Sequence, residues 1–171
     1  MKWMMRRVIP LLMVGVAVGA ASSLIAHPAA DDGKPILRVN SLKGTIDCTD
    51  RHVEIYSDGA DLVFTGKCLG LYFLGARTRA RIDRAQLVQV VGNNVDVAVT
   101  APLAELRMLG NHGTYEVGEV IDLYGQSDDN LVNMDRVVGV HLVGSRNVVK
   151  WKHGTPQVSD MGNQNQLGVA L

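Results

Sequence analysis

The chain has 171 residues with 17 basic and 17 acidic side chains, which leaves a net charge of zero at neutral pH. That balance excludes the strong positive charge typical of proteins that bind nucleic acid or anionic membranes. Without its first 26 residues the chain keeps 145, the length of one ordinary domain with a sizeable core.

Residues 1–26 have the layout of a secretory signal peptide. Three basic residues precede an apolar run at 8–21, and small residues follow it. We expect cleavage after Ala26, with Ser22 as the second choice. The alternative is an uncleaved anchor helix, because 8–26 is just long enough to span a bilayer. Cleavage after Ala26 leaves a net charge of −3 and no membrane span, so the sequence predicts export to the periplasm or beyond.

After a polar linker at 27–35, a short apolar string recurs and organises the rest of the chain. Its copies end at Ser57, Gly75, Gly92, Gly110, Gly125, Gly144 and Gly162, in steps of 18, 17, 18, 15, 19 and 18 residues. The residues three, five and seven positions after each marker are often apolar and alternate with polar ones, which indicates strands.

This repeat predicts an all-β domain at 36–171, a small parallel β-solenoid of six to seven coils with about 17–18 residues each. An antiparallel sandwich is the alternative, since its turns also recur every 8–12 residues or so. The solenoid is favoured because the whole unit repeats in phase. Asparagines near the glycines, such as Asn94, Asn147 and Asn165, suit tight turns with a left-handed backbone and can stack in ladders.

The two cysteines lie at similar places in successive units. Cys48 is nine residues before Ser57, and Cys68 is seven residues before Gly75. In a chain bound for an oxidising compartment, this placement predicts a disulfide between neighbouring coils. Two thiolates without companion ligands make a poor metal site, so no metal is expected.

Two polar surfaces are candidate contact sites. The position three before each marker glycine predicts a ladder on one outer face, in which Arg107 and Asp122 are direct neighbours, as are Asp122 and His141. The ladder comprises Gln89, Arg107, Asp122 and His141. The second surface is basic.

On the basic strand, Arg77, Arg79 and Arg81 alternate with Thr78, Ala80 and Ile82, so the arginines point outward. Arg79 is expected between Asp61 and Asp96 of the neighbouring coils, which favours ion pairing. A weak glycan contact is the other interpretation of this face.

The chain resembles an exported bacterial family of unknown function, the domain of unknown function with catalogue number 3060. The resemblance rests on the spaced cysteines, on the repeated Gly-x-x-Asn-x-hydrophobic unit, and on the stretch 143–165, which includes Trp151, Gly154 and Pro156. It extends over about residues 44–171. It implies an envelope or secreted β-repeat domain and assigns no activity.

No nucleophile triad, metal motif or phosphate loop is visible, and no cofactor is expected. We therefore predict a non-catalytic envelope scaffold or binding module. The alternative is a carbohydrate-active enzyme, a lyase or hydrolase built on a β-helix, which would need carboxylates gathered in one cleft. The final copy, 167–171, lacks a polar cap. Its edge is either a short frayed strand whose twist discourages pairing, or a contact site for a second copy end to end or for another envelope protein.

Overall fold

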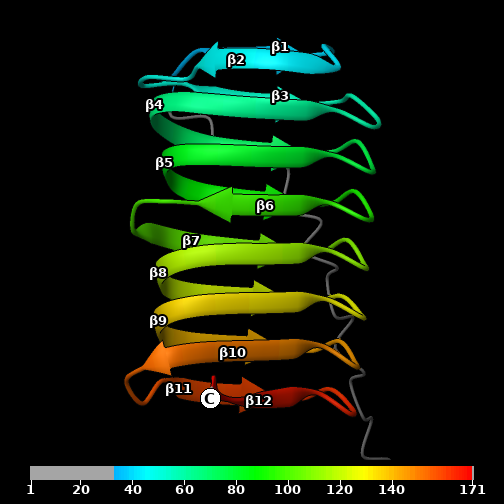
Figure 1. Cartoon of the computed structure of the whole chain (residues 1–171), viewed down its shortest axis with the longest axis vertical. Helices are drawn as coiled ribbons and strands as arrows, with labels where there is room; N and C mark the ends of the chain where they lie inside the picture. The colour runs from blue at the N-terminus through cyan, green and yellow to red at the C-terminus, as the bar shows by residue number, and fades with distance from the viewer. Residues whose placement is uncertain (1–32, 171) are drawn as a thin grey trace, which may run out of the picture.

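Parallel strands wound into stacked coils form the whole of the described structure. The computed structural model describes residues 33–170, and within that range it contains twelve strands and no helix. Every strand pairing is parallel, and the coils lie one above the next from β1 and β2 to β12 (Figure 1). The predicted all-β parallel solenoid is confirmed, with about eight turns rather than six to seven.

Four long strands and eight short ones make up the coils. They are β1 (Ile36–Val39), β2 (Lys43–Asp47), β3 (His52–Ile55), β4 (Asp61–Phe73), β5 (Arg79–Val90), β6 (Asp96–Val99), β7 (Leu103–Met108), β8 (Thr114–Gly125), β9 (Leu131–Leu142), β10 (Val148–His153), β11 (Gln157–Asp160) and β12 (Gln166–Val169). The predicted signal peptide, 1–26, and the linker as far as position 32 lie outside the described residues, as does Leu171. Residues 33–170 include no helix with the length and hydropathy that crossing a bilayer requires.

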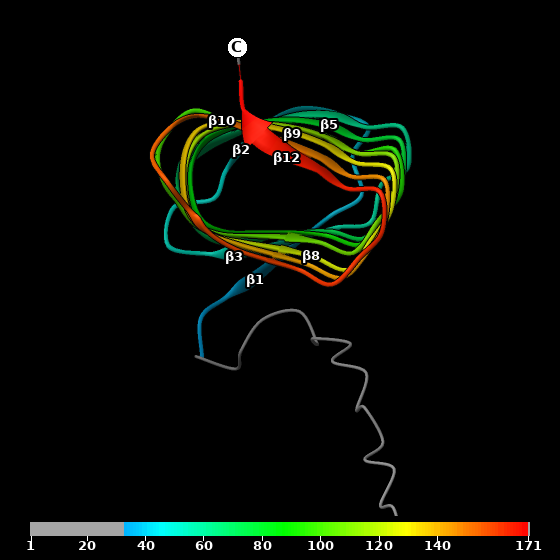
Figure 2. The same cartoon turned by 90° about the horizontal axis from the view of Figure 1, so that it is seen from below.

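The core is the inside of a flattened tube with two long walls, seen in cross-section in Figure 2. The first wall holds β2, β6, β10, β12 and the starts of the long strands, and the second wall holds β1, β3, β7, β11 and the ends of the long strands. Inward positions align from coil to coil because the strands pair in register. One fully buried row in the second wall is Val53, Leu71, Val88, Leu106, Leu123 and Val140. Each such side chain stabilises the fold by roughly 1.5–3 kcal/mol.

The two edges of the tube differ. At one edge the chain makes a tight turn, as the repeat predicts. At the other edge, where the sequence suggested a second turn, the long strands β4, β5, β8 and β9 bend and continue. In β8, for example, Val120 and Leu123 both face the core, and Ile121 and Asp122 between them face solvent. We call this the rounded edge.

Each tight turn has one residue in the left-handed backbone region, always at the same place in the coil. A positive φ is uncommon for residues other than glycine, and here glycine or a polar residue occupies this position in every turn. The residues are Gly59, Arg77, Asn94, His112, Asp129, Arg146 and Gln164. Arg77 therefore lies in a turn, two residues before β5 begins.

The prediction that Gly125 is a turn glycine is wrong. Gly125 is the last residue of β8, and Ser127 occupies the turn position. A Cβ on Gly144 would lie 1.7 Å from the Ser127 carbonyl oxygen, just as one on Gly110 would lie 1.9 Å from that of Gly92. Gly125 instead faces the core, where a Cβ would lie 2.6 Å from Leu142 Cδ2. Placing the turn at Ser127 replaces the irregular steps of 15 and 19 with 17 and 17.

The predicted disulfide is confirmed. Cys48 and Cys68 are bonded, both are fully buried, and their Cα atoms are 4.9 Å apart. They lie at the rounded edge of successive coils, where the Cys48 amide donates to the Thr65 carbonyl at 3.0 Å. The bond therefore ties the first described coil to the second.

We predict that changing both cysteines, Cys48→Ala with Cys68→Ala, lowers the free energy of unfolding by about 3 kcal/mol, because the bond closes a segment of 20 residues. Denaturant unfolding measures the change. A reductant should shift the wild-type midpoint by a similar amount and leave the double variant unchanged. A wild type indifferent to reductant would contradict the structural role of the bond.

Candidate functional site

The outer surface of the second wall carries a row of outward side chains that we call the contact row. Strand register places Gln89 beside Arg107, Arg107 beside Tyr124, Tyr124 beside His141, and His141 beside Ser159. Gln89 is buried, whereas Arg107 and His141 are half-buried and Tyr124 is 40% exposed. The accessible part of the row therefore runs from Arg107 to the exposed Ser159.

Asp122 does not belong to this row, so the predicted ladder is wrong at that position. Asp122 pairs with Glu105 on one side and with Gly139 on the other. The error follows from taking Gly125 as the turn residue, because the true turn at Ser127 shifts the copy by two residues. A shift of two keeps a side chain on the same face of a strand. Asp122 thus shares the outer face with Arg107 and His141 but lies diagonally to each.

Two contacts organise the exposed part of the contact row. Arg107 Nε donates to Glu105 Oε1, and this hydrogen bond raises the pKa of Arg107 above its ordinary value. One coil along, the rings of Tyr124 and His141 stack with centroids 4.9 Å apart and planes 13° from parallel. The surface therefore presents a paired guanidinium beside an aromatic stack.

Gly139 makes room for the Asp122 carboxylate on this surface. A Cβ at position 139 would lie 2.5 Å from Asp122 Oδ1 and 3.3 Å from His141 Nε2. The glycine is thus needed for space, because any side chain at position 139 would collide with the Asp122 carboxylate and crowd the His141 imidazole. The signal in the sequence was a glycine two residues before a ring, Gly139-x-His141, which the repeat analysis did not single out.

A similar arrangement occurs four coils earlier. A Cβ at Gly70 would lie 2.8 Å from His52 Nδ1 and 2.9 Å from the Tyr72 hydroxyl. There the tyrosine and the histidine are 3.5 Å apart, and both are buried. In both places, exposed at Gly139 and buried at Gly70, a glycine leaves room for a polar side chain of the preceding coil and for the ring two residues further along.

The basic strand face lies on the opposite side of the tube, on the first wall. Arg79 is paired in register with Asp61 and Asp96, and it forms an ion pair with Asp96 at 3.5 Å. Arg77, in its turn, contacts Asp58 at 3.5 Å. Arg81 is exposed between Val63 and Ala98. Two of the three predicted arginines are thus engaged within the fold.

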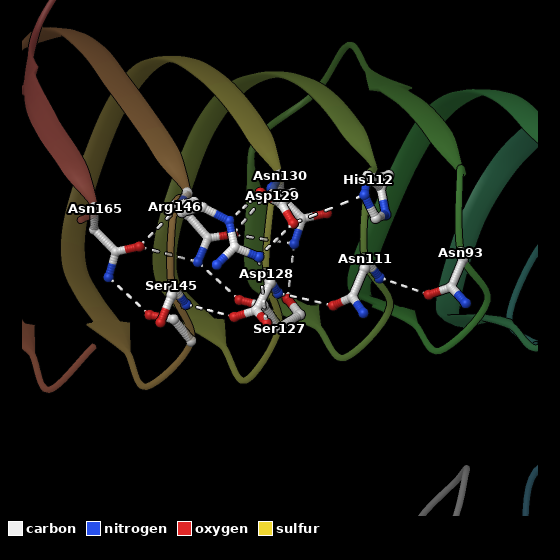
Figure 3. Close-up of polar contacts among 12 residues, drawn as sticks. Asn93, Asn111, His112, Ser127, Asp128, Asp129, Asn130, Ser145, Arg146 and Asn165 are labelled. Atoms are coloured by element: carbon white, nitrogen blue, oxygen red, sulfur yellow. Dashed lines mark hydrogen bonds and ion pairs between the residues drawn. The ribbon is translucent and has the colours of Figure 1, made fainter. Parts of the chain in front are cut away.

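The stacked tight turns form a polar edge, shown in Figure 3. Along its outer side, the side-chain oxygens of Asn93, Asn111 and Asp128 accept hydrogen bonds from the backbone amides of Asn111, Asp128 and Ser145, each one coil further on, at 2.6–2.8 Å. Arg146 adds two bonds of 2.7 Å to the Asp129 carboxylate, which lower the pKa of Asp129.

A second ladder lies inside this edge. Asn147 is fully buried, donates to the Ser127 carbonyl at 2.8 Å, and accepts from the Asn130 amide at 3.1 Å. Asn165 continues the ladder by accepting from the Asn147 amide at 2.8 Å. The predicted turn asparagines therefore occupy two different positions: Asn94 has the left-handed backbone, and Asn147 and Asn165 pair buried backbone groups.

The described part of the chain has no group of three or more histidine, cysteine, aspartate or glutamate side chains placed to hold a metal ion. The candidate site presents hydrogen-bond donors, acceptors and aromatic rings.

One comparison bears on the identity of the chain. Residues 118–164 match the family model described as "Protein of unknown function (DUF3060)". The resemblance to this family is confirmed over that stretch. The DUF3060 match covers the second half of β8, all of β9 and β10, and β11, so it includes Asp122, Tyr124, Gly139 and His141 of the candidate site. No curated protein and no solved structure matches the chain.

We predict that Asn147→Ala lowers the free energy of unfolding by about 3 kcal/mol, because it leaves the Ser127 carbonyl and the Asn130 amide unpaired in the interior. Asn93→Ala, on the exposed side of the same edge, is the matched control and should cost less than about 1 kcal/mol. Alanine already stands at the equivalent position 76. Equal losses in urea unfolding would show that the inner ladder has no special role.

Proposed function

We propose that the chain is an exported, non-catalytic binding module of the cell envelope that contacts envelope glycans through the second wall. The observation that carries this proposal is the exposed cluster of Arg107, Tyr124, His141 and Asp122 on one outer face. Rigid neighbouring strands hold these side chains at fixed spacing.

Export is supported by two independent features. The first 26 residues have the pattern of a signal peptide. The buried Cys48–Cys68 disulfide fits a protein that folds in an oxidising compartment such as the periplasm. An envelope location places the contact row among polysaccharides.

The chemistry of the surface suits sugars. The stack with His141 covers one face of the Tyr124 ring, and the exposed edge of the ring and its hydroxyl are available to a sugar. Arg107 supplies N–H donors and Asp122 supplies acceptors, which fix the orientation of ligand hydroxyls. Tyr124 lies between them, in register with Arg107 and two residues after Asp122.

One observation favours the alternative, a polysaccharide hydrolase or lyase. Glu105 and Asp122 are register partners on adjacent strands, whose spacing of about 4.8 Å is near the separation of about 5–5.5 Å found between the carboxyls of retaining glycosidases. Glu105 is, however, bound to Arg107, and the groove beside this face is lined by neither carboxylate. Binding is therefore the function that the geometry supports better.

We predict that Tyr124→Ala weakens binding by tenfold or more to those envelope glycans that the wild type binds, because the exposed ring edge and its hydroxyl are lost. Binding of purified protein to a glycan array, followed by calorimetry on the hits, measures this. Arg79→Ala on the first wall is the matched control and should leave affinity within twofold.

The same glycans should remain intact after prolonged incubation with the wild type. Released reducing ends or unsaturated products that disappear in Asp122→Asn would establish the enzymatic alternative. Equal effects of Tyr124→Ala and Arg79→Ala would contradict the assignment of the binding face.

A further inference from the structure

A groove of about 350 Å³ runs along the rounded edge and borders the contact row. Side chains of β4, β5, β8 and β9 reach it where these strands bend. Its lining includes four charged side chains and an exposed aliphatic pair: Lys67, Arg84, Arg136 and Glu119, with Ile121 and Val138. None of these side chains takes part in the contacts of the contact row.

The cations of this groove are not neutralised by the fold. Lys67 and Arg84 are register partners on adjacent strands, so two cationic side chains start from backbones about 4.8 Å apart along the stack. Like charges placed directly opposite each other on a sheet are destabilising. Among residues 33–170, neither side chain forms an ion pair, whereas Arg38, Arg79, Arg107, Arg146 and Lys152 all do.

The lining of the groove has a net positive charge. Arg136 is the register partner of Glu119, yet their charged groups do not come within ion-pair distance of each other. The groove lining thus carries three positive charges and one negative charge, in a chain whose total charge is zero. This local excess of positive charge favours an anionic ligand.

The groove also has an apolar lining that is open to solvent. Ile121 is 55% exposed and Val138 is 57% exposed, at equivalent positions of neighbouring coils. An exposed apolar pair of this kind in a groove that also carries charged side chains favours a ligand with an apolar face as well as a negative charge.

We propose that this groove binds the carboxylate-bearing sugar units of an envelope polysaccharide. A uronic acid residue has both required parts: a carboxylate for Lys67 and Arg84, and a ring face of C–H groups for Ile121 and Val138. A volume of about 350 Å³ accommodates a short oligosaccharide segment. The groove and Tyr124 then contact successive units of one chain. This inference rests on the proposed glycan-binding function and names its ligand class.

The test compares each acidic oligosaccharide with its own carboxyl-reduced form. The probes are oligogalacturonate, a glucuronate-containing oligomer, and peptidoglycan strands whose lactyl groups carry carboxylates. By calorimetry with the mature, disulfide-bonded protein, we expect at least one acidic probe to bind tenfold or more tightly than its neutral counterpart. Its affinity should fall as sodium chloride rises from 50 to 200 mM.

The double variant Lys67→Gln with Arg84→Gln should abolish the difference between acidic and neutral forms. Its thermal stability should not decrease, because it removes a repulsive pair. Arg81→Gln, an exposed cation on the first wall, is the control for nonspecific attraction and should leave the difference intact. Loss in Arg81→Gln equal to that in the double variant would overturn the site.

The two proposals fail in different ways. If glycans bind through Tyr124 but their carboxylates make no difference, the binding function stands and the groove assignment is wrong. If no acidic or neutral glycan binds, both are wrong.

Discussion

In-register hydrogen bonding between each strand and its counterpart one coil along is the interaction on which the rest of this structure depends. It fixes the rise of the stack at about 4.8 Å per coil and keeps equivalent residues in line. Buried rows such as Leu71, Val88 and Leu106 are continuous because of it. Outward rows are continuous for the same reason, so any change of register in one coil would break the core and the surface together.

The edges preserve that register by different means. At the tight turns, one left-handed residue per coil and two hydrogen-bonded ladders hold the backbone, with Asn147 pairing groups that water cannot reach. At the rounded edge the long strands bend without a break, and the Cys48–Cys68 bond ties the first two described coils. The last described coil has a polar residue where the preceding coil has a buried one. Asp160 is the register partner of buried Leu142, and its carboxylate accepts hydrogen bonds from the Gly162 amide and the Asn165 side chain.

The in-register stacking of the strands also forms the proposed binding surfaces. A rigid wall brings Arg107, Tyr124 and His141 into one row, and a bend in four strands opens the groove that Lys67 and Arg84 border. Gly139 contributes by lacking a side chain, which leaves the space that the Asp122 carboxylate fills. A repetitive scaffold thus carries a surface that is not repetitive, and the differences between coils give it its chemistry.

The sequence by itself determined the period, the strand character, the inward and outward alternation and the disulfide, because each is a local pattern repeated many times. The prediction from sequence was wrong where the same residue type can be required for two different structural reasons. Gly125 resembles the turn glycines but is small to fit beneath Leu142, and Ser127 makes the turn, so Asp122 was placed two residues out of register. Only the tertiary structure decided that the second edge is a bend, that Gly139 makes room for a carboxylate, and that Lys67 stands beside Arg84 without an acid. Those features arise between coils, from side chains about 17 residues apart, and no local pattern records them.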